Sequence, residues 1–504
     1  MPRIVQSKPI VFVEPVRTND AHEQITVTKL SEDQRAVYDG TMTWLNRGTA
    51  TKQILKLAGC AGTGKSALVS LLAHEMPSPL AFCAFTGKAS SVLGRKLAAS
   101  GIATVNRIVS AKDALTGARP FEPRPYCGTI HGLVFRPCDA CMVEKVYVHT
   151  YGDGCTADMD DDLVVEGAVV VPSNIGGRCL ACDPPPPVKR EGHCSRCNDG
   201  RYLRRERLDR TYKLIVIDEA SMVSDDMLAA LKSYGIPILA VGDHKQLQPV
   251  GATGSLMRDP DFRLETIHRQ AAGNPIIALS ARIRATGDID DALDDGEAFT
   301  IIAQRNLNDW IAKRFTPARL QADPTTAAGI MSTVLVAWTN KARVGLNYDV
   351  RAALGLGRHD APTKGEALIC LKNAAPIYNG MRGVLRSDAM QAGDAEGKAP
   401  KFKVTVDFTE DNQVAENILV SEDQFFQEKT IDYDKACGMG VSMAQLGGLY
   451  DFGYGLTCHK MQGSQAAEVG VVVEGYMSRM PKEDRTRWLY TACTRAASRL
   501  TVIR

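Results

Sequence analysis

The chain has 504 residues, and at roughly 150 residues per domain it is expected to form three or four units. Its 60 Lys and Arg nearly balance its 58 Asp and Glu, for a formal net charge of +2, so charge neither requires nor excludes a nucleic-acid partner. A hydrophobic content of 44% with 23% charged residues excludes a disordered or collagen-like chain. No apolar run reaches the roughly 18 residues of a membrane span, and the start, MPRIVQSKPIVFVEPV, does not resemble a signal peptide. We therefore expect a cytoplasmic protein with no membrane partner.

The clearest local signal is an apolar strand at 54–58, a glycine-rich turn, and a helical pattern from Ser66. The turn fits G-x-x-x-x-G-K-[ST], in which backbone N–H groups wrap the phosphates of a nucleotide and the helix offers its positive end. Lys65 is placed to reach the β and γ phosphates, and the Ser66 hydroxyl to bind magnesium. The predicted ATP-binding loop is Gly59, Cys60, Ala61, Gly62, Thr63, Gly64, Lys65 and Ser66.

A second signal is the continuous apolar run 214–217, which is typical of a strand covered on both faces. Asp218 follows it at the carboxyl edge, where ligands bind in open α/β sheets, and Glu219 is next. We predict that Asp218 holds magnesium and that Glu219 is the general base for the attacking water. A third strand, 238–241, precedes Gln246, which is placed to sense the γ-phosphate.

Fourteen cysteines are many for a reducing compartment, and eight of them lie between residues 127 and 197. The other six are mostly in apolar stretches, where a thiol behaves as a small hydrophobic side chain: Cys60, Cys83, Cys370, Cys437, Cys458 and Cys493. The pattern C-x-x-C occurs three times in the dense region, and such a turn lets two thiolates hold one tetrahedral ion. We predict that zinc is bound by Cys138, Cys141, Cys179, Cys182, Cys194 and Cys197.

The pairing of these ligands stays open. The nearest complete set by sequence is Cys179, Cys182, Cys194 and Cys197. The first pair, Cys138 and Cys141, either joins one of the other pairs or forms a second site with partners from Cys127, His149, Cys155 and His193. Redox switching is the competing chemistry, but three pairs in a proline-containing insert fit a structural metal site better.

Charge is uneven around this insert. Residues 150–200 contain nine acids and four bases, whereas 201–213 contain six bases and two acids. The basic run is either a solvated helix face or a surface that grips a nucleic-acid backbone and separates strands. Under the second interpretation, the charges of Arg204, Arg205 and Arg207 matter more for unwinding of a fork than for ATP hydrolysis.

The second half of the chain has apolar β-branched runs at 334–338 and 469–473, which predict another buried sheet, and it has no P-loop of its own. Between them, residues 363–440 alternate short β-like runs with Asn-Gly and Gly turns, including Asn379-Gly380, which predicts a small β-barrel.

In order and spacing, these motifs resemble the RecD/Dda-like branch of superfamily 1 helicases, superfamily 1B. VIDEASMV and VGDHKQLQPVG are similar to its motifs II and III, LSEDQRAVYD to its Q motif, AFTGKASSVL to motif Ia and TIHGL to motif Ib. LETIHRQ, VAWTNKARVGLN, GLTCHKMQGSQ and WLYTACTRAASRL are similar to later segments of the family. The resemblance covers most of the chain; the cysteine-rich insert, where relatives carry a wedge hairpin, departs from it.

The resemblance implies further site residues. Gln34 would contact adenine, although it also fits a helix capping box with Ser31. Arg269 would reach ATP, and Arg495, from the second domain, would neutralise the transferring phosphoryl group when the cleft closes. The nucleic-acid contacts would be Thr86, Lys88, His131, Trp338, Asn340, Thr457, His459 and Lys460. For Trp338 a place in the core is an equally good interpretation.

The predicted fold is α/β, with two RecA-like P-loop motor domains whose parallel sheets are covered by helices. The expected boundaries are an N-terminal arm at 1–28, motor domain 1A at 29–128 and 205–273, a zinc-binding insertion at 129–204, motor domain 2A at 274–362 and 441–504, and an SH3-like β-barrel at 363–440.

The predicted function is an ATP- and Mg²⁺-dependent DNA helicase that moves 5′ to 3′ on single-stranded DNA and unwinds forked duplex DNA, with the polarity implied by the resemblance alone. Replication or recombination proteins are candidate partners, and the sequence does not distinguish replication, recombination and repair. Two alternatives stay open: an RNA helicase or ribonucleoprotein remodeller, and a zinc-bearing binding protein that recruits partners under ATP control.

Overall fold

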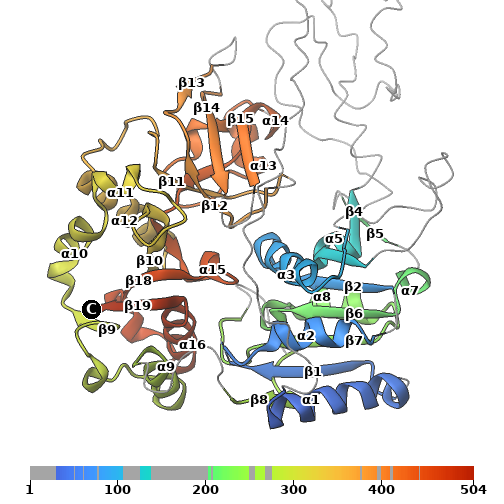
Figure 1. Cartoon of the computed structure of the whole chain (residues 1–504). Helices are drawn as coiled ribbons and strands as arrows, with labels where there is room; N and C mark the ends of the chain where they lie inside the picture. The colour runs from blue at the N-terminus through green and yellow to red at the C-terminus, as the bar shows by residue number, and fades with distance from the viewer. Residues whose placement is uncertain are drawn as a thin grey trace, which may run out of the picture.

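The computed structural model describes residues 30–49, 51–60, 62–76, 79–105, 125–137, 202–205, 208–248, 256–266, 275–374, 377–393, 399–408, 413–441 and 443–504. They form two α/β units, with an antiparallel β unit above the second of them (Figure 1). The first α/β unit spans β1 to β8, the second is built around β9, β10 and β17 to β19, and the β unit contains β11 to β16.

The first α/β unit has a six-stranded sheet in the order β3-β2-β6-β7-β1-β8, and every neighbouring pair is parallel. Its strands are β1 (Ile54–Gly59), β2 (Leu80–Ala84), β3 (Tyr126–Thr129), β6 (Leu214–Asp218), β7 (Ile238–Gly242) and β8 (Phe262–Leu264). The apolar runs 54–58, 214–217 and 238–241 therefore form strands, as predicted.

These strands are apolar throughout because helices cover both faces of the sheet. In β6, Leu214 and Val216 pack in one core cluster, and Ile215 and Ile217 pack in another. All four side chains are fully buried. The helices are α1 (Glu32–Thr43), the π-helix η2 (Trp44–Gly48), α2 (Lys65–Ala73), α3 (Gly87–Ala99), α5 (Ile130–Val134), α7 (Leu208–Thr211), η4 (Ala220–Met222) and α8 (Asp225–Lys232).

The second α/β unit has a five-stranded sheet in the order β17-β10-β18-β19-β9, again parallel throughout. Its strands are β9 (Phe299–Ile302), β10 (Thr333–Ala337), β17 (Gly455–Thr457), β18 (Ala466–Val472) and β19 (Ala496–Ile503). The runs 334–338 and 469–473 thus fall on β10 and β18, as predicted. The helices are α9 (Pro275–Thr286), η5 (Asp291–Leu293), η6 (Gln304–Asn306), α10 (Leu307–Arg314), α11 (Pro317–Gln321), η7 (Ile330–Ser332), α12 (Asn340–Ala353), α15 (Cys458–Met461), η10 (Gly475–Arg479) and α16 (Lys482–Cys493).

The β unit is a six-stranded antiparallel sheet. Its strands are β11 (Ala367–Cys370), β12 (Arg382–Leu385), β13 (Met390–Gln391), β14 (Lys401–Phe408), β15 (Gln413–Ser421) and β16 (Tyr450–Phe452), with η9 (Glu422–Gln424), α13 (Tyr433–Gly438) and α14 (Met443–Leu446) beside them. Alternate residues of β14 are buried, as expected for a sheet with one covered face. The antiparallel β character was predicted; closure into an SH3-like barrel stays a prediction.

Two buried ion pairs join the β unit to helix α12. Arg351 Nε lies 2.9 Å from Glu366 Oε1, with both side chains fully buried, and Arg343 NH1 lies 2.5 Å from Asp451 Oδ2. Breaking such a pair leaves an uncompensated buried charge and costs about 3–5 kcal/mol. The β unit is therefore firmly attached to the second α/β unit.

The cysteine-rich insert leaves the first α/β unit through β4 (Phe135–Pro137) and returns through β5 (Tyr202–Arg204), which pair antiparallel. All six predicted zinc ligands lie outside the described residues, and zinc stays a prediction. Within the described ranges, no group of three or more His, Cys, Asp or Glu side chains is placed to hold a metal.

Part of the basic run has a structural role. Arg204 donates to the carbonyl of Ala230 at 3.0 Å and stacks its guanidinium 4.5 Å from the centre of the Tyr234 ring, and Arg205 donates to the carbonyl of Gly132. These contacts fasten the returning strand to α8 and α5, so the two arginines do not form the solvated helix face that was one interpretation of the run. Arg207 lies outside the described residues.

The cysteines predicted to be structural behave as packing residues where the structure describes them. Cys60, Cys83, Cys370, Cys458 and Cys493 are buried free thiols, and the side chain of Cys437 is outside the described part. Cys127, one of the alternative zinc ligands, lies in β3, where its thiol is buried 3.4 Å from the carbonyl of Ser90. It is a core residue of the first sheet.

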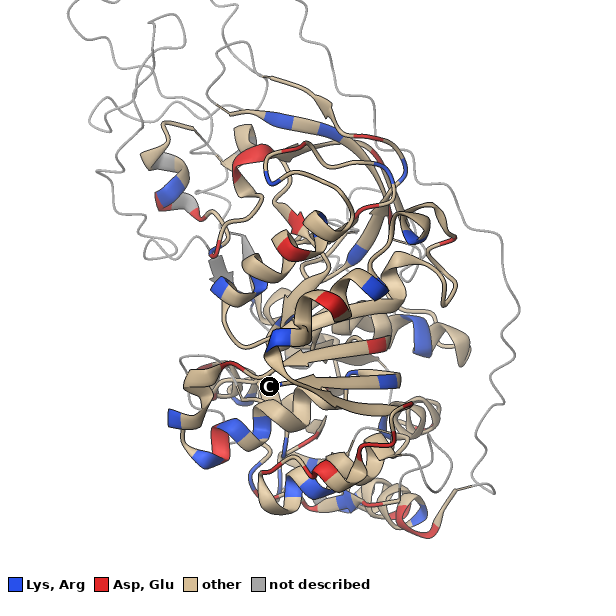
Figure 2. Cartoon of the chain, turned by 90° about the vertical axis from the view of Figure 1, so that its left-hand side faces the viewer, with Lys and Arg blue, Asp and Glu red and all other residues tan. Residues whose placement is uncertain are grey.

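Within the described part of the chain, no helix combines the length and apolar character needed to cross a bilayer. Lys, Arg, Asp and Glu are interspersed over the outer side of the second α/β unit (Figure 2).

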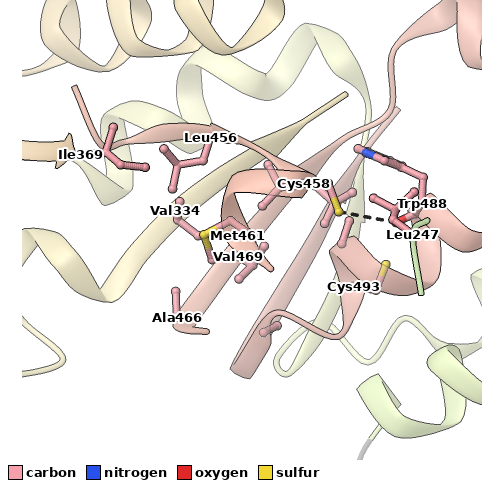
Figure 3. Packing of buried hydrophobic residues seen from close by; sticks show 14 of the residues in the cluster. Leu247, Val334, Ile369, Leu456, Cys458, Met461, Ala466, Val469, Trp488 and Cys493 are labelled. Carbon is pink, nitrogen blue, oxygen red and sulfur yellow. Dashed lines mark hydrogen bonds between the residues drawn. The ribbon is translucent and has the colours of Figure 1, made fainter. Parts of the chain in front are cut away.

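The two α/β units are in direct contact. Leu247, from the loop after β7 of the first unit, lies in the same buried cluster as Val334 and Trp488 of the second (Figure 3). Its backbone N–H also donates to Thr491 Oγ1 at 3.1 Å. Residues at the carboxyl edge of the first sheet therefore meet helix α16 across the boundary between the units.

Candidate functional site

The glycine-rich turn has the backbone of a phosphate-binding loop. It connects β1 to α2, and Gly62 and Gly64 adopt φ angles of 86° and 80°, which favour glycine. A Cβ on Gly64 would also lie 2.6 Å from Gln34 Nε2. Lys65 Nζ donates to the carbonyls of Gly59 at 2.7 Å and Cys60 at 2.8 Å. The loop thus presents its lysine and the start of α2 to the sheet edge, an arrangement that suits phosphate.

Gln34 joins helix α1 to this loop. Its Oε1 accepts the backbone N–H of Ser31 at 3.2 Å, which confirms the capping box, and its Nε2 donates to the carbonyl of Thr63 at 3.3 Å. The neighbouring Asp33 accepts the backbone N–H groups of Glu265 and Thr266, both at 3.0 Å. Burial acts to raise the pKa of Asp33, but these bonds and one from Ser31 lower it to about 2.

The two predicted acids lie at the carboxyl end of β6, Asp218 as its last residue and Glu219 as the next, and β6 is separated from β1 only by β7. Asp218 and the loop hydroxyl of Ser66 therefore supply oxygen ligands at one sheet edge, a donor set that fits Mg²⁺. Glu219 has left-handed backbone angles, φ 52° and ψ 41°, which are rarely adopted by a non-glycine residue outside functional sites. Burial raises the pKa of Glu219, and Asp218 raises it further, against the effect of Lys65 and Arg495.

The third motif places two polar side chains in the buried contact between the units. Asp243 is fully buried and accepts the Tyr490 hydroxyl, from α16, at 2.7 Å. Gln246 is only 4% exposed, and its Nε2 lies 3.5 Å from Asp243 Oδ2. The loop that was predicted to sense a γ-phosphate is therefore hydrogen-bonded to the second α/β unit.

Two arginines of the second unit lie at this boundary. Arg495 is 4% exposed and donates within its own unit to the carbonyls of Thr491 at 2.9 Å and Ser464 at 3.4 Å. Arg284, near the end of α9, reaches across the boundary and hydrogen-bonds the Cys60 thiol of the glycine-rich loop. Its guanidinium lies 5.8 Å from the centre of the Tyr490 ring. Arg269 and Ala61 are outside the described residues.

A threonine caps the helix that follows each of four parallel strands. The four residues are Thr86 and Thr339, just after β2 and β10, and Thr129 and Thr457, the last residues of β3 and β17. Each Oγ1 accepts the backbone N–H of the residue three positions later, at 3.0 to 3.4 Å. Capped helix N-termini at a sheet edge present backbone N–H groups that suit nucleic-acid phosphates. The first turn of α3 meets the segment after α15 across the boundary, since a Cβ on Gly463 would lie 3.2 Å from the Cβ of Ala89.

Several predicted nucleic-acid contacts are covered by the β unit. Lys88 is 3% exposed, and Lys460 Nζ donates to Asn379 Oδ1, in the connection between β11 and β12, at 2.6 Å. Tyr378 of the same connection packs on Gly87: a Cβ added to Gly87 would lie 2.6 Å from the Cβ of Tyr378. Burial lowers the pKa of Lys460 to about 8, with Arg343 contributing and Cys370 opposing.

The remaining predicted contacts differ in exposure. Asn340 is exposed at the start of α12. His131 lies in α5 with its ring 4.8 Å from that of Phe135, and burial lowers its pKa. Trp338 packs on the core, 6.0 Å from the ring of Trp488 and 6.4 Å from that of His459. This packing favours the core interpretation of Trp338.

The AAA domain model matches residues 29–306, more than half of the chain. The chain belongs to the AAA domain family. The UvrD-like helicase C-terminal domain model matches residues 452–503, which cover β17, α15, β18, η10, α16 and β19. The AAA domain match contains the glycine-rich loop and both acids, and the helicase match contains Arg495. The chain is therefore a P-loop protein with the domains of a helicase.

The chain is also similar in structure to Pif1 helicases. One such structure concerns DNA unwinding at forked double-stranded DNA by two coordinating Pif1 helicases. It aligns with 13% identity and a TM-score of 0.46, and the alignment covers 94% of this chain and 92% of the other. Pif1 from Candida albicans aligns with 17% identity, a TM-score of 0.44 and 94% of both chains. Pif1 from Bacteroides with ADP-AlF3 and single-stranded DNA aligns with 13% identity, a TM-score of 0.44, and 94% and 92% of the two chains. No curated protein matches the chain by sequence.

Sequence reasoning missed three contributors to the boundary: Arg284, the role of Asp243 as partner of Tyr490, and the contact of Asn379 with Lys460. Nothing in the helical pattern PIIALSARIRAT distinguishes Arg284 from the neighbouring Arg282. Asp243 was not singled out, although a carboxylate directly after a buried strand could have been recognised as a candidate.

Proposed function

We propose that the protein is a superfamily 1B, ATP-dependent DNA helicase that moves 5′ to 3′ along single-stranded DNA and separates duplex strands at a fork. The observation that carries this proposal is the division of one site between two α/β units. The glycine-rich loop and the acids come from the first unit; from the second, Arg284 contacts that loop at Cys60 and Tyr490 contacts Asp243 in the loop after β7. A site built in this way is sensitive to the distance between the units.

For ATP, the residues of the first unit supply binding and chemistry. The loop N–H groups and Lys65 hold the phosphates, and Gln34 orients the loop and contacts adenine. Mg²⁺, bound through Ser66 and Asp218, would neutralise phosphate charge. Glu219 accepts the proton of the attacking water once its own carboxyl is ionised, and Gln246 senses the γ-phosphate. Arg269 and Arg495 neutralise the transferring phosphoryl group, Arg495 after a small closure of the boundary.

For the nucleic acid, the four threonine-capped helices supply the support. Two lie in each α/β unit, so a strand bound across them is gripped by both bodies, and a change in their separation on ATP hydrolysis would advance the strand. Thr86, Lys88, Thr457 and Lys460 lie on either side of the boundary, and His131, Asn340 and His459 extend the same surface.

Unwinding of duplexes with either a 5′ or a 3′ single-stranded tail tests the proposal. With ATP and Mg²⁺ we expect strand separation only on the 5′-tailed substrate, and no separation by Lys65→Ala, which loses the phosphate contact. ATPase stimulation by DNA and by RNA of the same sequence is measured in parallel. Absence of unwinding on both tails would contradict the helicase proposal, and preferential stimulation by RNA would change the substrate.

We also propose that the insert binds zinc through the three C-x-x-C pairs and that it supports the strand-separating surface in a cytoplasmic enzyme. Three closely spaced pairs are a specific zinc pattern. Metal analysis of the purified full chain should find one or two zinc ions, and Cys179→Ser/Cys182→Ser should lower that content. Cys83→Ser is the matched control, because Cys83 is buried in β2. Zinc content below one ion per chain would contradict the proposal.

A further inference from the structure

A cavity of about 570 Å³ lies between the two α/β units. One wall comes from Ser221 of η4 and from the loop after β7, and the other comes from the end of α9 and the start of α16. Arg284 belongs to this lining and also hydrogen-bonds Cys60 of the glycine-rich loop. The cavity therefore starts beside the loop that is proposed to hold the ATP phosphates.

The charge of the lining favours an anion. Five cationic side chains and one carboxylate contribute to it: Lys245, Arg258, Arg284, Lys482 and Arg487, against Glu483. The single carboxylate is engaged by Arg487 at 2.5 Å. Four positive groups are left without a lining acid, and positive groups gathered around a cavity attract small anions.

The inner wall has polar atoms without partners. Ser221 and Gln246 are 8% and 4% exposed, yet within the described ranges Ser221 Oγ, His244 Nδ1, Gln246 Oε1 and Arg284 Nε have no hydrogen-bond partner. Buried polar groups are nearly always hydrogen-bonded. The four residues that carry these atoms all line the same cavity, which favours a polar ligand there.

We propose that this cavity binds inorganic phosphate, the second product of ATP hydrolysis, before it leaves the protein. The proposal rests on the proposed ATPase function. In that reaction the water oxygen bonds to the γ-phosphorus and the bond to the β–γ bridging oxygen breaks, which yields ADP, hydrogen phosphate and a proton. The Ser221 hydroxyl and Arg284 Nε–H donate to the phosphate oxygens. Gln246 Oε1 accepts the hydrogen of the P–OH group, which the γ-phosphate of ionised ATP does not carry.

Calorimetric titration of inorganic phosphate into the ADP-bound full chain tests the site without turnover. We expect saturable binding of one phosphate, and weaker binding of sulfate, which has no proton to donate to Gln246 at neutral pH. Arg258→Glu/Lys482→Glu, at exposed positions of the two walls, should weaken phosphate binding about tenfold or more and leave ADP affinity within about twofold. The matched control is Arg305→Glu/Lys313→Glu, two exposed positions on η6 and α10.

Absence of phosphate binding would overturn the proposal. Equal phosphate affinity in the wild type and in Arg258→Glu/Lys482→Glu would also overturn it, because the affinity of a phosphate held only by the glycine-rich loop would not change with these substitutions. A chain that binds phosphate in this way but unwinds no duplex would contradict the helicase proposal alone. Unwinding without a phosphate site would contradict this inference alone.

Discussion

The two α/β units have the same parallel-sheet architecture but different roles at their boundary. The first carries the glycine-rich loop, with Gly62 and Gly64 at positive φ, and the two acids at the carboxyl end of β6. The second has no such loop among its described residues, and two of the side chains that it turns toward the first are a cation and an aromatic ring: Arg284 on Cys60 and Tyr490 on Asp243. Under the proposed function, a second sheet without a phosphate-binding loop completes the nucleotide site because its side chains cross the boundary.

The largest expected effect is at Arg495. If this guanidinium completes the site from the second unit, Arg495→Lys, which keeps the charge but loses the planar fork, should lower ATP turnover about a thousandfold with little change in nucleotide affinity. Single-turnover hydrolysis and ATP binding measure the two quantities. Arg499→Lys is the control, because Arg499 is an exposed residue of β19 paired with Glu468. Turnover within about tenfold of wild type would remove Arg495 from the site.

A smaller effect is expected from Tyr490→Phe, which deletes the hydroxyl that joins the units. Loss of a hydrogen bond to a charged group costs about 1.5–3 kcal/mol, so DNA-stimulated turnover should fall about tenfold or more. Tyr476→Phe, at a residue 40% exposed in η10, is the matched control. Equal turnover in both variants would show that the bond to Asp243 does not hold the boundary together.

The proposed nucleic-acid surface, which the β unit covers at Lys460, is expected to bind DNA in a pH-dependent way. In the covered state, with Lys460 buried beside Asn379, burial lowers the pKa of Lys460 to about 8. In an opened state Lys460 has the ordinary lysine pKa near 10.5. Between these two pH values the covered state therefore binds fewer protons than the opened state. Raising the pH through that window therefore stabilises the covered state. Apparent affinity for single-stranded DNA should fall roughly tenfold between pH 8 and about 9.5, and not between pH 6 and 8.

Fluorescence anisotropy of a labelled strand measures this affinity, and Asn379→Ala, which removes the partner of Lys460, should reduce the pH effect. An identical pH profile in wild type and Asn379→Ala would show that the contact does not control access to the surface.

The smallest effect concerns the anchoring of helix α1. The Asp33 carboxylate accepts two backbone N–H groups of the segment after β8, and its pKa is about 2. A carboxyl group whose pKa is lowered in the folded state stabilises the fold at pH values above its ordinary pKa, which is near 4. This stabilisation is lost as the pH falls toward 2. Asp33→Asn should therefore lower the free energy of unfolding at neutral pH by about 1 kcal/mol, allowing for partial exposure. Denaturant unfolding measures it, with exposed Asp39→Asn of the same helix as control; an equal loss in both would contradict the anchoring role.

Much of the local structure could be predicted from the sequence. The runs around β1, β6 and β7 are apolar at every position because helices cover both faces of the sheet, and alternate residues of β6 do pack in opposite clusters. The alternation in β14 likewise fits a sheet with one covered face. The second sheet was harder to delimit, because its outer strand β9 comes before β10 in the chain but pairs with β19, at the far end of the sequence.

What the sequence by itself determined is the chemistry of each segment: phosphate-binding turn, acid-ended strand, threonine-capped helices and C-x-x-C pairs are local patterns, fixed by residue type and spacing over a few positions. Only the tertiary structure decided which of these segments meet. Arg284 reaches Cys60 across 224 positions of sequence, and Asn379 covers Lys460 across 81. Such contacts depend on how two sheets and a β unit pack against one another, and that packing is set by the summed burial of many side chains, which no short stretch of sequence contains.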